Sequence, residues 1–372
     1  MMPKMSHEAR KKMPVLKIGD LTATVPIVQG GMSVGISLSN LTSAVANEGG
    51  IGVIGAAGIG MLEPDFRSNF EEANKRALKR EIRKAKKKTN GIIGVNIMVV
   101  LSDFFSLVRV AVEEGANLIF AGAGLPLKSL KAVMDTTKEV KTKFVPIVSS
   151  ARAAELIFTY WARHYNEVPD AVVVEGPLAG GHLGFAKDRI NDKNYSLKKI
   201  LPEVISVVKS FAKRFNKDIP VIAAGGIYTG ADIHKFMQLG ADGVQMATRF
   251  VGTHECDASD EFKEIYIKCK KEDIVIIDSP VGLPGRAIRN KFLEDVAMGK
   301  KQPFTCTYKC LKTCDYKKVP YCIALALTNA KKGFLENGFA FSGANAWRVN
   351  KIVSVKELFG LLMKEYQEAA AQ

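Results

Sequence analysis

Glycines and polar residues follow short apolar runs at several places in the chain, and they are the first candidates for chemistry. Gln29-Gly30-Gly31-Met32, Ala179-Gly180-Gly181-His182 and Ala224-Gly225-Gly226 show this pattern. Glycine has no Cβ, so a loop built from it lets the backbone approach a ligand closely. One such loop would be explained by a tight turn. Several of them predict a shared ligand site if the fold brings them to one rim.

His182 is the candidate catalytic residue, because its imidazole ends one of these glycine loops. An imidazole titrates near neutral pH and can serve as a general base or as a hydrogen-bond donor. The alternative is a ring whose polar atoms are satisfied by the backbone. The place of His182 on a Gly-Gly loop favours the active interpretation. His164, His234 and His254 lie on predicted helices and loops and are expected to be structural.

Eight short apolar runs supply the strands that these loops require. They are rich in Val and Ile and show no alternation of apolar and polar residues, which is typical of parallel strands buried on both faces. The predicted strands are Pro26–Gln29, Ile51–Ile54, Ile92–Met98, Leu118–Ala121, Phe144–Ser149, Ala171–Val174, Pro220–Ala223 and Gly243–Met246.

Amphipathic stretches alternate with these strands and predict an α/β fold, a (β/α)8 TIM barrel. The units fit within about 250 residues, the usual size of such a barrel. A doubly wound sheet is the alternative, but it usually has fewer strands and one dominant phosphate loop near the N-terminus. The predicted helices are Leu38–Asn47, Phe66–Lys88, Phe104–Glu114, Leu127–Val140, Ala151–Tyr165, Leu197–Phe215 and Ala231–Leu239.

A barrel of this kind places the carboxyl ends of all its strands at one face, where its active site lies. The residues that follow the strands are therefore the candidate binding residues. The seventh and eighth loops match the usual phosphate position of such barrels, with glycines in one and hydrogen-bond donors in the other. The candidates are Gly30, Gly31, Met32, Asn96, Ser149, Glu175, Gly180, Gly181, Gly225, Gly226, Gln245, Met246, Ala247 and Thr248.

The segment 50–55 matches the pattern G-x-G-x-x-G literally. The dinucleotide-binding fingerprint requires a strand before the motif and a helix directly after it. Here a predicted helix precedes the motif and a predicted strand lies inside it. We interpret these glycines as residues that flank a strand.

A further segment follows the eighth strand. Glu261–Lys271 and Val355–Gln367 are expected to be helical, and Ser279–Asn290 is expected to be a loop rich in Pro and Gly. The segment is too short and irregular to predict an independent domain. We therefore expect a ligand-binding barrel over 14–272 and a smaller C-terminal cap over 273–372.

Four cysteines in the cap, Cys306, Cys310, Cys314 and Cys322, are spaced C-x3-C-x3-C-x7-C. On a helix the first three would share a face, and thiolates so placed can bind zinc or an iron–sulfur cluster. The spacing matches neither the C-x2-C pairs of zinc sites nor the ferredoxin runs. Small half-buried structural residues are the alternative, so metal binding stays open.

The composition excludes several classes of protein. The chain has 372 residues, of which 47% are hydrophobic and 24% charged, and this excludes intrinsic disorder and a disulfide-built mini-protein. The N-terminus has no long apolar run, so no secretory signal is expected. No stretch is suited to span a membrane. Cysteines are few for this length, which favours a cytoplasmic, reduced protein.

The net charge of +15 is compatible with a polyanionic partner, a phosphorylated ligand or a basic surface. Much of it lies in Arg76–Lys88, on a predicted helix away from the catalytic rim. Neither interleaved aromatic residues nor a recognised module indicates nucleic-acid binding. We expect a solvated helix face and no nucleic-acid partner.

Five motifs together resemble the nitronate monooxygenase family, formerly called 2-nitropropane dioxygenases, and the related FMN-dependent enoyl-acyl-carrier-protein reductases. They span Pro26 to about Gly252, and the order and spacing of AGGH, AAGGI and Gln-x-x-Thr make the combination specific. The resemblance implies a (β/α)8 barrel that binds FMN without a covalent bond. The motifs are PIVQGGM, GVNIMV, AGAGLP, EGPLAGGHLGF and AAGGIYTGADIHKFMQLGADGVQMATRF.

The resemblance also implies roles for the matching residues. Asn96 would hydrogen-bond the flavin, and His182 would act beside it as a general base or as a donor to a nitro group. The neighbours of the flavin ring would be Gly30, Gly31, Met32, Glu175 and Gly180, and the phosphate would be held by Gly225, Gly226 and Gln245–Thr248.

Two departures from the family pattern bear on the reaction. The monooxygenases have Gln at the position of Glu175 and an acid at that of Leu178, whereas the enoyl reductases have Glu at the first position. The leading hypothesis is oxidation of small alkyl nitronates with oxygen. The alternative is an NAD(P)H-dependent enoyl reductase, with acyl carrier protein as a partner. A non-catalytic barrel that binds anions or nucleic acid is the remote alternative, and homodimer formation stays open.

Overall fold

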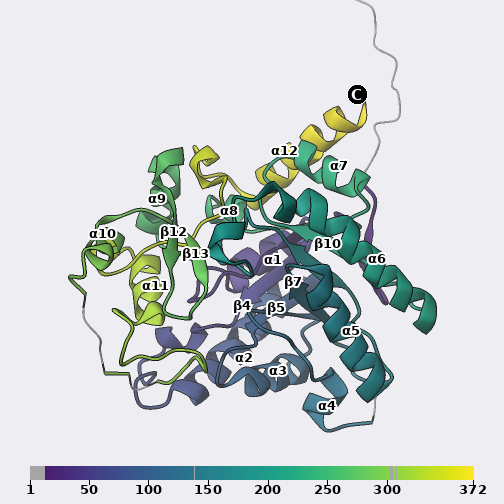
Figure 1. Cartoon of the computed structure of the whole chain (residues 1–372), viewed down its shortest axis with the longest axis horizontal. Helices are drawn as coiled ribbons and strands as arrows, with labels where there is room; N and C mark the ends of the chain where they lie inside the picture. The colour runs from purple at the N-terminus through teal and green to yellow at the C-terminus, as the bar shows by residue number, and fades with distance from the viewer. Residues whose placement is uncertain (1–12, 138, 302–304, 307) are drawn as a thin grey trace, which may run out of the picture.

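Eight parallel strands form a closed barrel at the centre of the molecule, which confirms the predicted TIM barrel (Figure 1). This computed structural model describes residues 13–137, 139–301, 305–306 and 308–372. The N-terminal residues 1–12, where no secretory signal is expected, lie outside this part. In order around the barrel the strands are β3 (Ile27–Gln29), β4 (Ile51–Gly55), β5 (Ile92–Met98), β6 (Leu118–Gly122), β7 (Lys143–Val148), β8 (Val172–Glu175), β10 (Val221–Ala224) and β11 (Gly243–Met246).

The barrel interior is a packed apolar core and not a pore. Val28, Phe120 and Ile222 belong to one buried cluster inside the ring of strands. An antiparallel hairpin that the sequence analysis did not anticipate, β1 (Leu16–Ile18) with β2 (Leu21–Ala23), adds its apolar side chains to this cluster. Leu16 packs beside Gly243 at the start of β11. The hairpin therefore covers the end of the barrel opposite the predicted site.

Helices surround the barrel and bury one apolar face each, as the amphipathic patterns predict. The expected helix Leu127–Val140 is wrong in length, because α4 ends after Met134 where Asp135 adopts a left-handed backbone with φ of 50°; residue 138 lies outside the described part. The helices between the strands are α1 (Ser39–Asn47), α2 (Phe70–Lys88), α3 (Phe104–Glu113), α4 (Leu130–Met134), α5 (Ala151–Tyr165), α6 (Leu197–Phe215), α7 (Gly230–Gln238) and the short α8 (Thr248–Val251).

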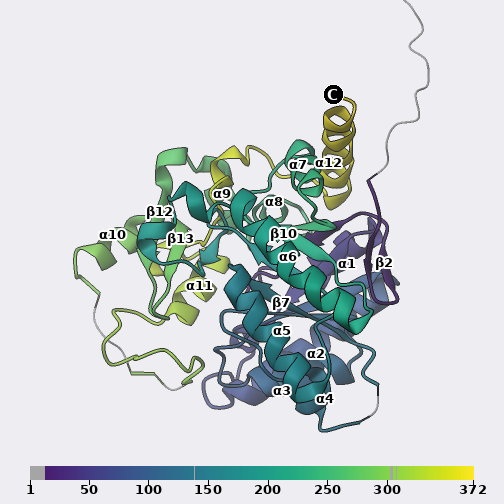
Figure 2. The same cartoon turned by 45° about the vertical axis from the view of Figure 1, so that its right-hand side comes forward.

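A small antiparallel sheet stands beside the barrel and joins distant parts of the chain (Figures 1 and 2). Its order is β12 (Ile274–Asp278), β13 (Pro284–Ile288) and β9 (Gly181–His182). The expected loop Ser279–Asn290 is therefore wrong over Pro284–Ile288, which form β13. Proline is tolerated as the first residue of a strand, and Gly285 has no side chain where the ring of Phe341 packs. The sheet takes strands from both sides of the predicted boundary at residue 272.

The remaining helices of the C-terminal segment are α9, α10, α11 and α12. Helices α10 and α11 pack with the small sheet around Phe292, Tyr321 and Phe339. Among the described residues, no helix is long and apolar enough to cross a membrane. The bounds are α9 (Asp260–Lys268), α10 (Lys291–Ala297), α11 (Ile323–Lys331) and α12 (Val355–Ala370).

The basic face of α2 is partly compensated by carboxylates of neighbouring elements. Glu114 accepts ion pairs from Lys79 at 3.1 Å and from Arg83 at 2.6 Å, and Arg80 pairs with Glu63 at 2.7 Å. Such exposed pairs contribute little stability each. They do reduce the field that the run of basic residues presents to solvent.

Helix α12 lies across α7, and the contact depends on Gly230 (Figures 1 and 2). The Gly230 N–H donates to Glu365 Oε2 at 2.7 Å. A Cβ at Gly230 would overlap the carbonyl oxygen of Leu362. The absence of a side chain at this position therefore sets the distance between the two helices.

We expect Gly230→Ala to destabilise the protein by about 1–3 kcal/mol, because the added methyl pushes α12 away from α7. The matched control is Gly360→Ala in the exposed interior of α12, where a Cβ would meet nothing within 4 Å. That change should stabilise the protein by about 0.5–1 kcal/mol. Chemical denaturation of the three proteins measures both effects. Equal effects of the two substitutions would contradict the packing argument.

Candidate active site

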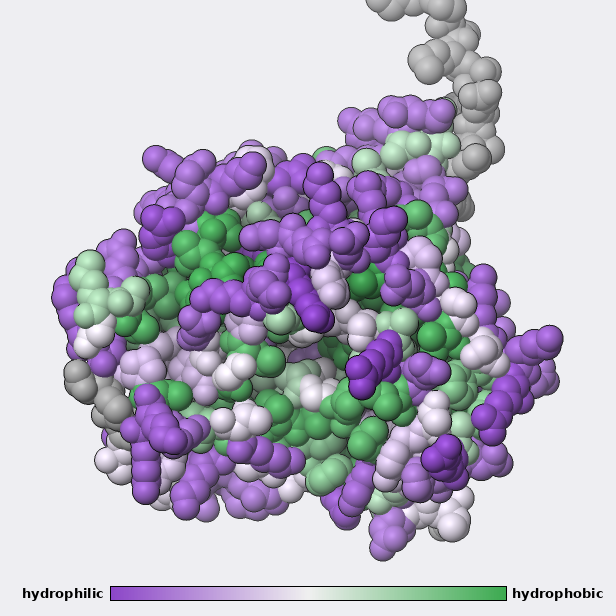
Figure 3. Space-filling view, in the orientation of Figure 1, coloured by the Kyte–Doolittle hydropathy of each residue, from purple (hydrophilic) through white to green (hydrophobic). Residues whose placement is uncertain are grey.

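A cavity of about 310 Å³ lies at the carboxyl ends of the barrel strands. This volume falls in the range of small-molecule sites. On the face drawn in Figure 3, apolar residues gather across the middle of the view and hydrophilic residues surround them. His182 and all the predicted binding residues except Ser149 line the cavity. Ser149 instead lies against Gly184, so its predicted role gains no support from its position.

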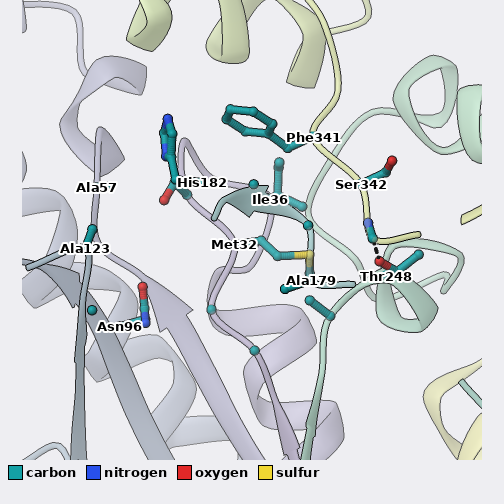
Figure 4. A pocket seen from close by; sticks show the side chains of 18 of the residues that line it. Met32, Ile36, Ala57, Asn96, Ala123, Ala179, His182, Thr248, Phe341 and Ser342 are labelled. Atoms are coloured by element: carbon teal, nitrogen blue, oxygen red, sulfur yellow. Dashed lines mark hydrogen bonds between the residues drawn. The ribbon is translucent and has the colours of Figure 1, made fainter. Parts of the chain in front are cut away.

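Hydrogen bonds fix the loop that follows β3 at the cavity. The fully buried amide of Gln29 donates to the Gly30 carbonyl at 2.6 Å and accepts from the Val53 N–H at 2.9 Å. Gly31 must lack a Cβ, because one would overlap the Cβ of Asn96. Within the described residues no protein group hydrogen-bonds the Asn96 amide, which projects from β5 into the pocket (Figure 4). This amide is therefore free to bind a ligand.

A segment far along the chain, Phe341–Asn345, crosses the mouth of the barrel, and we call it the strap. The Gly343 N–H donates to Thr248 Oγ1 at 3.0 Å (Figure 4). The Ala344 N–H donates to the Leu178 carbonyl at 3.1 Å, and the Asn345 amide donates to the Gly226 carbonyl at 2.8 Å. These bonds fix three barrel loops relative to one another.

Ser342 of the strap carries an unsatisfied polar atom. Ser342 is buried and lines the cavity, and its Oγ has no hydrogen-bond partner among the described residues. Leaving a buried hydroxyl unpaired costs roughly 1–3 kcal/mol. The oxygen is enclosed by protein atoms, so the fold bears this cost.

The loop after β10 forms a glycine cradle. Gly225 and Gly226 have φ values of 93° and 84°, a backbone region that favours glycine. A Cβ at Gly225 would come within 2.7 Å of the Gly176 carbonyl oxygen. Beyond the cradle, Tyr228 lies between the guanidinium groups of Arg249 and Arg348, at 4.3 Å and 4.4 Å from its ring centre. Tyr228 lines the cavity, so both cations lie near it without lining it themselves.

Glu175 is an unpaired carboxyl at the end of β8. No cation forms an ion pair with it among the described residues, and it lines the cavity. Burial raises its pKa to about 7, because the charged form loses its water. A carboxyl in such surroundings is a functional candidate.

His182 is held at the cavity by the small sheet. Its Nε2 lies 2.7 Å from Ser279 Oγ, and its ring meets Phe341 edge to face at 4.9 Å (Figure 4). Burial lowers the pKa of His182 to about 4. A pKa lowered in this way favours the neutral imidazole at physiological pH.

Arg286 of β13 positions the loop that precedes His182. The buried guanidinium donates from Nη1 to the carbonyl oxygens of Pro177 at 2.6 Å and Ala179 at 2.5 Å. Burial lowers its pKa to about 10. This arginine orients the backbone that carries Gly180 and Gly181.

Several residues at the site follow residue 252, where the resembling motifs end, and they were not predicted from the sequence. Ser279 and Arg286 fall in the segment taken for a loop. Ser342 and Asn345 fall in GFAFSGANA, where glycine beside polar residues repeats the pattern of the barrel loops. That repetition is the signal from which Ser342 and Asn345 could have been predicted as site residues.

Comparison with known proteins gives a consistent result. The family model described as nitronate monooxygenase matches residues 16–365. A Staphylococcus aureus (strain Newman) protein named "Probable nitronate monooxygenase" is 28% identical over 306 residues, which cover 74% of this chain and 79% of that one. A Mycobacterium tuberculosis protein named as a hydroxy-methyl-oxo-octahydro-indene-carboxyl-CoA dehydrogenase is 28% identical over 276 residues. That match covers 74% of this chain and 66% of the relative, just under two thirds of its length.

Solved structures show the same architecture. FabK from Thermotoga maritima matches with a TM-score of 0.71 and 28% identity, covering 93% of this chain and 94% of its own. Nitroalkane oxidase from Streptomyces ansochromogenes matches with a TM-score of 0.71 and 21% identity over 93% of this chain and 97% of its own, a likeness of fold. The matching family model spans nearly the whole described chain, from the basal hairpin to the last helix. The chain belongs to the nitronate monooxygenase family.

Proposed function

We propose that the cavity binds FMN and that the protein is an FMN-dependent oxidoreductase that oxidises alkyl nitronates with oxygen. The observation that carries the proposal is the composition of the cavity wall. The cavity wall holds a glycine cradle and Tyr228, which two arginines contact, and the Asn96 amide, which has no partner among the described residues, offers hydrogen bonds. Such a wall suits a largely planar ligand that ends in an anion.

The residues that line the cavity fit FMN. Gly225, Gly226 and Thr248 would hold the phosphate, because glycine backbone can approach it and a hydroxyl stands beside it. Gly31 and Asn96 would meet the ring, because the missing Cβ of Gly31 lets the Asn96 side chain stand beside the loop at the cavity. When bound, the flavin supplies the redox chemistry. The protein supplies binding, orientation and exclusion of water.

The neutral state of His182 favours one of its two expected roles. A base whose pKa is about 4 is too weak to remove a proton from a nitroalkane at neutral pH. An alkyl nitronate already lacks that proton and needs a hydrogen-bond donor for its oxygens. We therefore assign His182 as a donor that orients the substrate, with Ser279 holding the ring.

A second candidate function is the NAD(P)H-dependent reduction of an enoyl thioester, with acyl carrier protein as a partner. Two observations favour it. Glu175 matches the residue that the resemblance assigns to the reductases, and the similarity to FabK extends over 93% of the chain at 28% identity. In that case a neutral Glu175 carboxyl would donate a hydrogen bond to the substrate.

Turnover measurements separate these functions. We expect the purified protein to show a flavin spectrum, and to consume propyl-2-nitronate and oxygen faster than it oxidises NAD(P)H with an enoyl thioester. His182→Ala should lower nitronate turnover by about 10²-fold, because a donor to developing charge is lost, while FMN stays bound. The control His164→Ala changes an exposed ring on α5 and should have no effect. Protein that neither contains nor binds FMN would refute both functions.

The glycine cradle gives a separate test of FMN binding. We expect Gly225→Ala to raise the Kd for FMN at least about tenfold, because its Cβ would collide with the Gly176 carbonyl and displace the loop. Gly299→Ala is the control, since Gly299 also has a positive φ of 71° but its Cβ would meet nothing within 4 Å. Fluorescence titration with FMN measures both constants. An unchanged Kd in Gly225→Ala would place the phosphate elsewhere.

The pKa of Glu175 predicts the pH dependence of nitronate oxidation. As the pH rises through about 7, Glu175 gains a negative charge that repels the nitronate anion, so kcat/KM should fall. His182 should add no inflection between about pH 5 and 8, because its pKa lies below that range. Glu175→Gln should abolish the fall. An inflection that persists in Glu175→Gln would assign the titration to another group.

A further inference from the structure

Apolar side chains from the C-terminal segment form one wall of the cavity, and we call it the apolar wall. It consists of Ile323 and Leu327 in α11 together with Phe339 and Phe341, all four of which line the cavity. The same four side chains pack in one hydrophobic cluster beside the small sheet. Ile323 and Leu327 are four residues apart in α11, so one face of the helix presents both of them. The apolar wall is therefore continuous.

The apolar wall begins beside the histidine that we assign to orient the substrate. The ring of Phe341 meets the imidazole of His182 edge to face at 4.9 Å (Figure 4). Phe341 in turn meets Phe339 edge to face, with their ring centres 5.1 Å apart. A substrate whose reacting end is held by His182 would therefore have the rest of its structure within reach of this wall.

Contacts within the protein hold the apolar wall in place. The Phe341 carbonyl accepts a hydrogen bond from the Tyr266 hydroxyl at 2.5 Å. A Cβ at Gly338 would overlap the carbonyl oxygen of Ala326 in α11, so the chain that leads to Phe339 lies directly on this helix. The wall is thus fixed by packing, and a ligand need not order it.

Part of the apolar wall keeps its surface exposed to the cavity. Ile323 and Phe339 are buried, whereas Leu327 and Phe341 are only half-buried. An apolar group that covers this remaining surface is removed from water, which favours binding. Each methylene buried in this way strengthens binding by about two- to fourfold. The wall therefore rewards a hydrocarbon chain in proportion to its length.

The described residues that line the cavity include no Lys or Arg, and Glu175 is the only Asp or Glu among them. The nearby arginines have other contacts. Arg286 donates to backbone carbonyls of the loop after β8, and Arg249 and Arg348 lie on the ring of Tyr228 in the loop after β10. A carboxylate placed against the apolar wall would lose its water without gaining a partner, which is unfavourable.

Cys310 and Leu311 border the apolar wall without adding charge to it. Leu311 packs against the same cluster and pairs with Leu101 through an antiparallel bridge. Burial raises the pKa of the Cys310 thiol to about 12, so the thiol is neutral at physiological pH. No helix forms over the described residues 305–306 and 308–314. The expectation that Cys306, Cys310 and Cys314 share a helix face is therefore wrong.

We propose that the apolar wall binds the hydrocarbon tail of the substrate, so that the enzyme prefers nitronates with a long, uncharged alkyl chain over short or carboxylate-bearing ones. This proposal rests on the proposed nitronate oxidation and adds the class of substrate that the same site takes. His182 would hold the nitronate oxygens while the chain lies along Phe341 and Leu327. A carboxylate at the end of the chain would find no cation there.

A series of primary nitronates tests the proposal on the unaltered protein. We measure kcat/KM for the nitronates of nitropropane, nitrobutane and nitrohexane, and for that of ω-nitrohexanoate, in which a carboxylate replaces the terminal methyl group. We expect kcat/KM to rise about two- to fourfold with each added methylene and to fall at least about tenfold when the carboxylate replaces the methyl. Equal kcat/KM at all chain lengths, or equal use of the two six-carbon nitronates, would overturn the proposal while nitronate oxidation stands.

A cation introduced at the apolar wall should reverse the preference. In Leu327→Arg we expect the ratio of kcat/KM for the ω-nitrohexanoate nitronate to that for the nitrohexane nitronate to rise at least about tenfold, because the guanidinium can pair with the carboxylate. The control Leu361→Arg changes an exposed leucine of α12 that does not line the cavity, and it should leave the ratio unchanged. An unchanged ratio in folded Leu327→Arg would contradict the proposal.

The milder variant Leu327→Ala covers the case in which Leu327→Arg does not fold. It removes part of the apolar surface, so each added methylene should raise kcat/KM less than in the unaltered protein, with no gain for the carboxylate-bearing nitronate. An unchanged dependence on chain length in Leu327→Ala would count against the assigned wall.

A binding measurement separates this proposal from the proposed reaction. Calorimetric titration of the purified protein with propanol and hexanol requires no turnover. Tighter binding of hexanol than of propanol, weakened in Leu327→Ala, would support the apolar wall as a hydrocarbon site even if nitronates were not oxidised, and only the reaction would then be refuted. Absence of any difference between the two alcohols, together with absence of nitronate turnover, would refute both.

Discussion

Three hydrogen bonds from the strap hold the open end of the barrel together. The carboxyl ends of parallel strands lead into loops that the sheet itself does not fix. The strap bonds the loops after β8, β10 and β11 through Leu178, Gly226 and Thr248. The Ser342 N–H donates to the carbonyl of Arg286 in β13 at 3.0 Å. The strap therefore also ties the small sheet to the barrel loops.

The electrostatics of the cavity follow from the loss of water in it. Glu175 and His182 bear opposite charges when ionised, yet burial drives both toward the neutral form, raising one pKa and lowering the other. Neither has a charged partner among the described residues. Burying ionisable groups without partners costs free energy, and such groups occur where a bound ligand supplies the missing interactions. The same argument applies to the Asn96 amide.

Local patterns in the sequence were sufficient to predict the barrel. Its strands are continuous Val- and Ile-rich runs such as Ile92–Met98, and its helices show clear amphipathic spacing, so each element is encoded where it occurs. The glycine loops were predicted for the same reason, since Gly31 and Gly225 lie next to their strands. These features need no knowledge of distant partners.

Features that depend on distant partners were missed. Strand β13 pairs with His182, which lies about a hundred residues earlier in the chain, a separation that no local pattern encodes. Burial lowers the pKa of His182. Phe341, which packs on its ring, lies far along the chain, so the residue type alone could not predict the shift. The segment that carries Cys310 and Cys314 is placed by the pairing of Leu311 with Leu101, and not by a helix.

The position of the strap in the chain has a consequence for biosynthesis. A chain leaves the ribosome from its N-terminus and folds as it emerges. The hairpin that covers the base of the barrel is made first, whereas the strap follows all eight strands. During translation the nascent barrel therefore passes through a stage in which the hairpin covers its base. At that stage the loops after β8, β10 and β11 still lack their hydrogen bonds to the strap. A cofactor that arrives at this stage would meet a wider entrance than the finished protein offers.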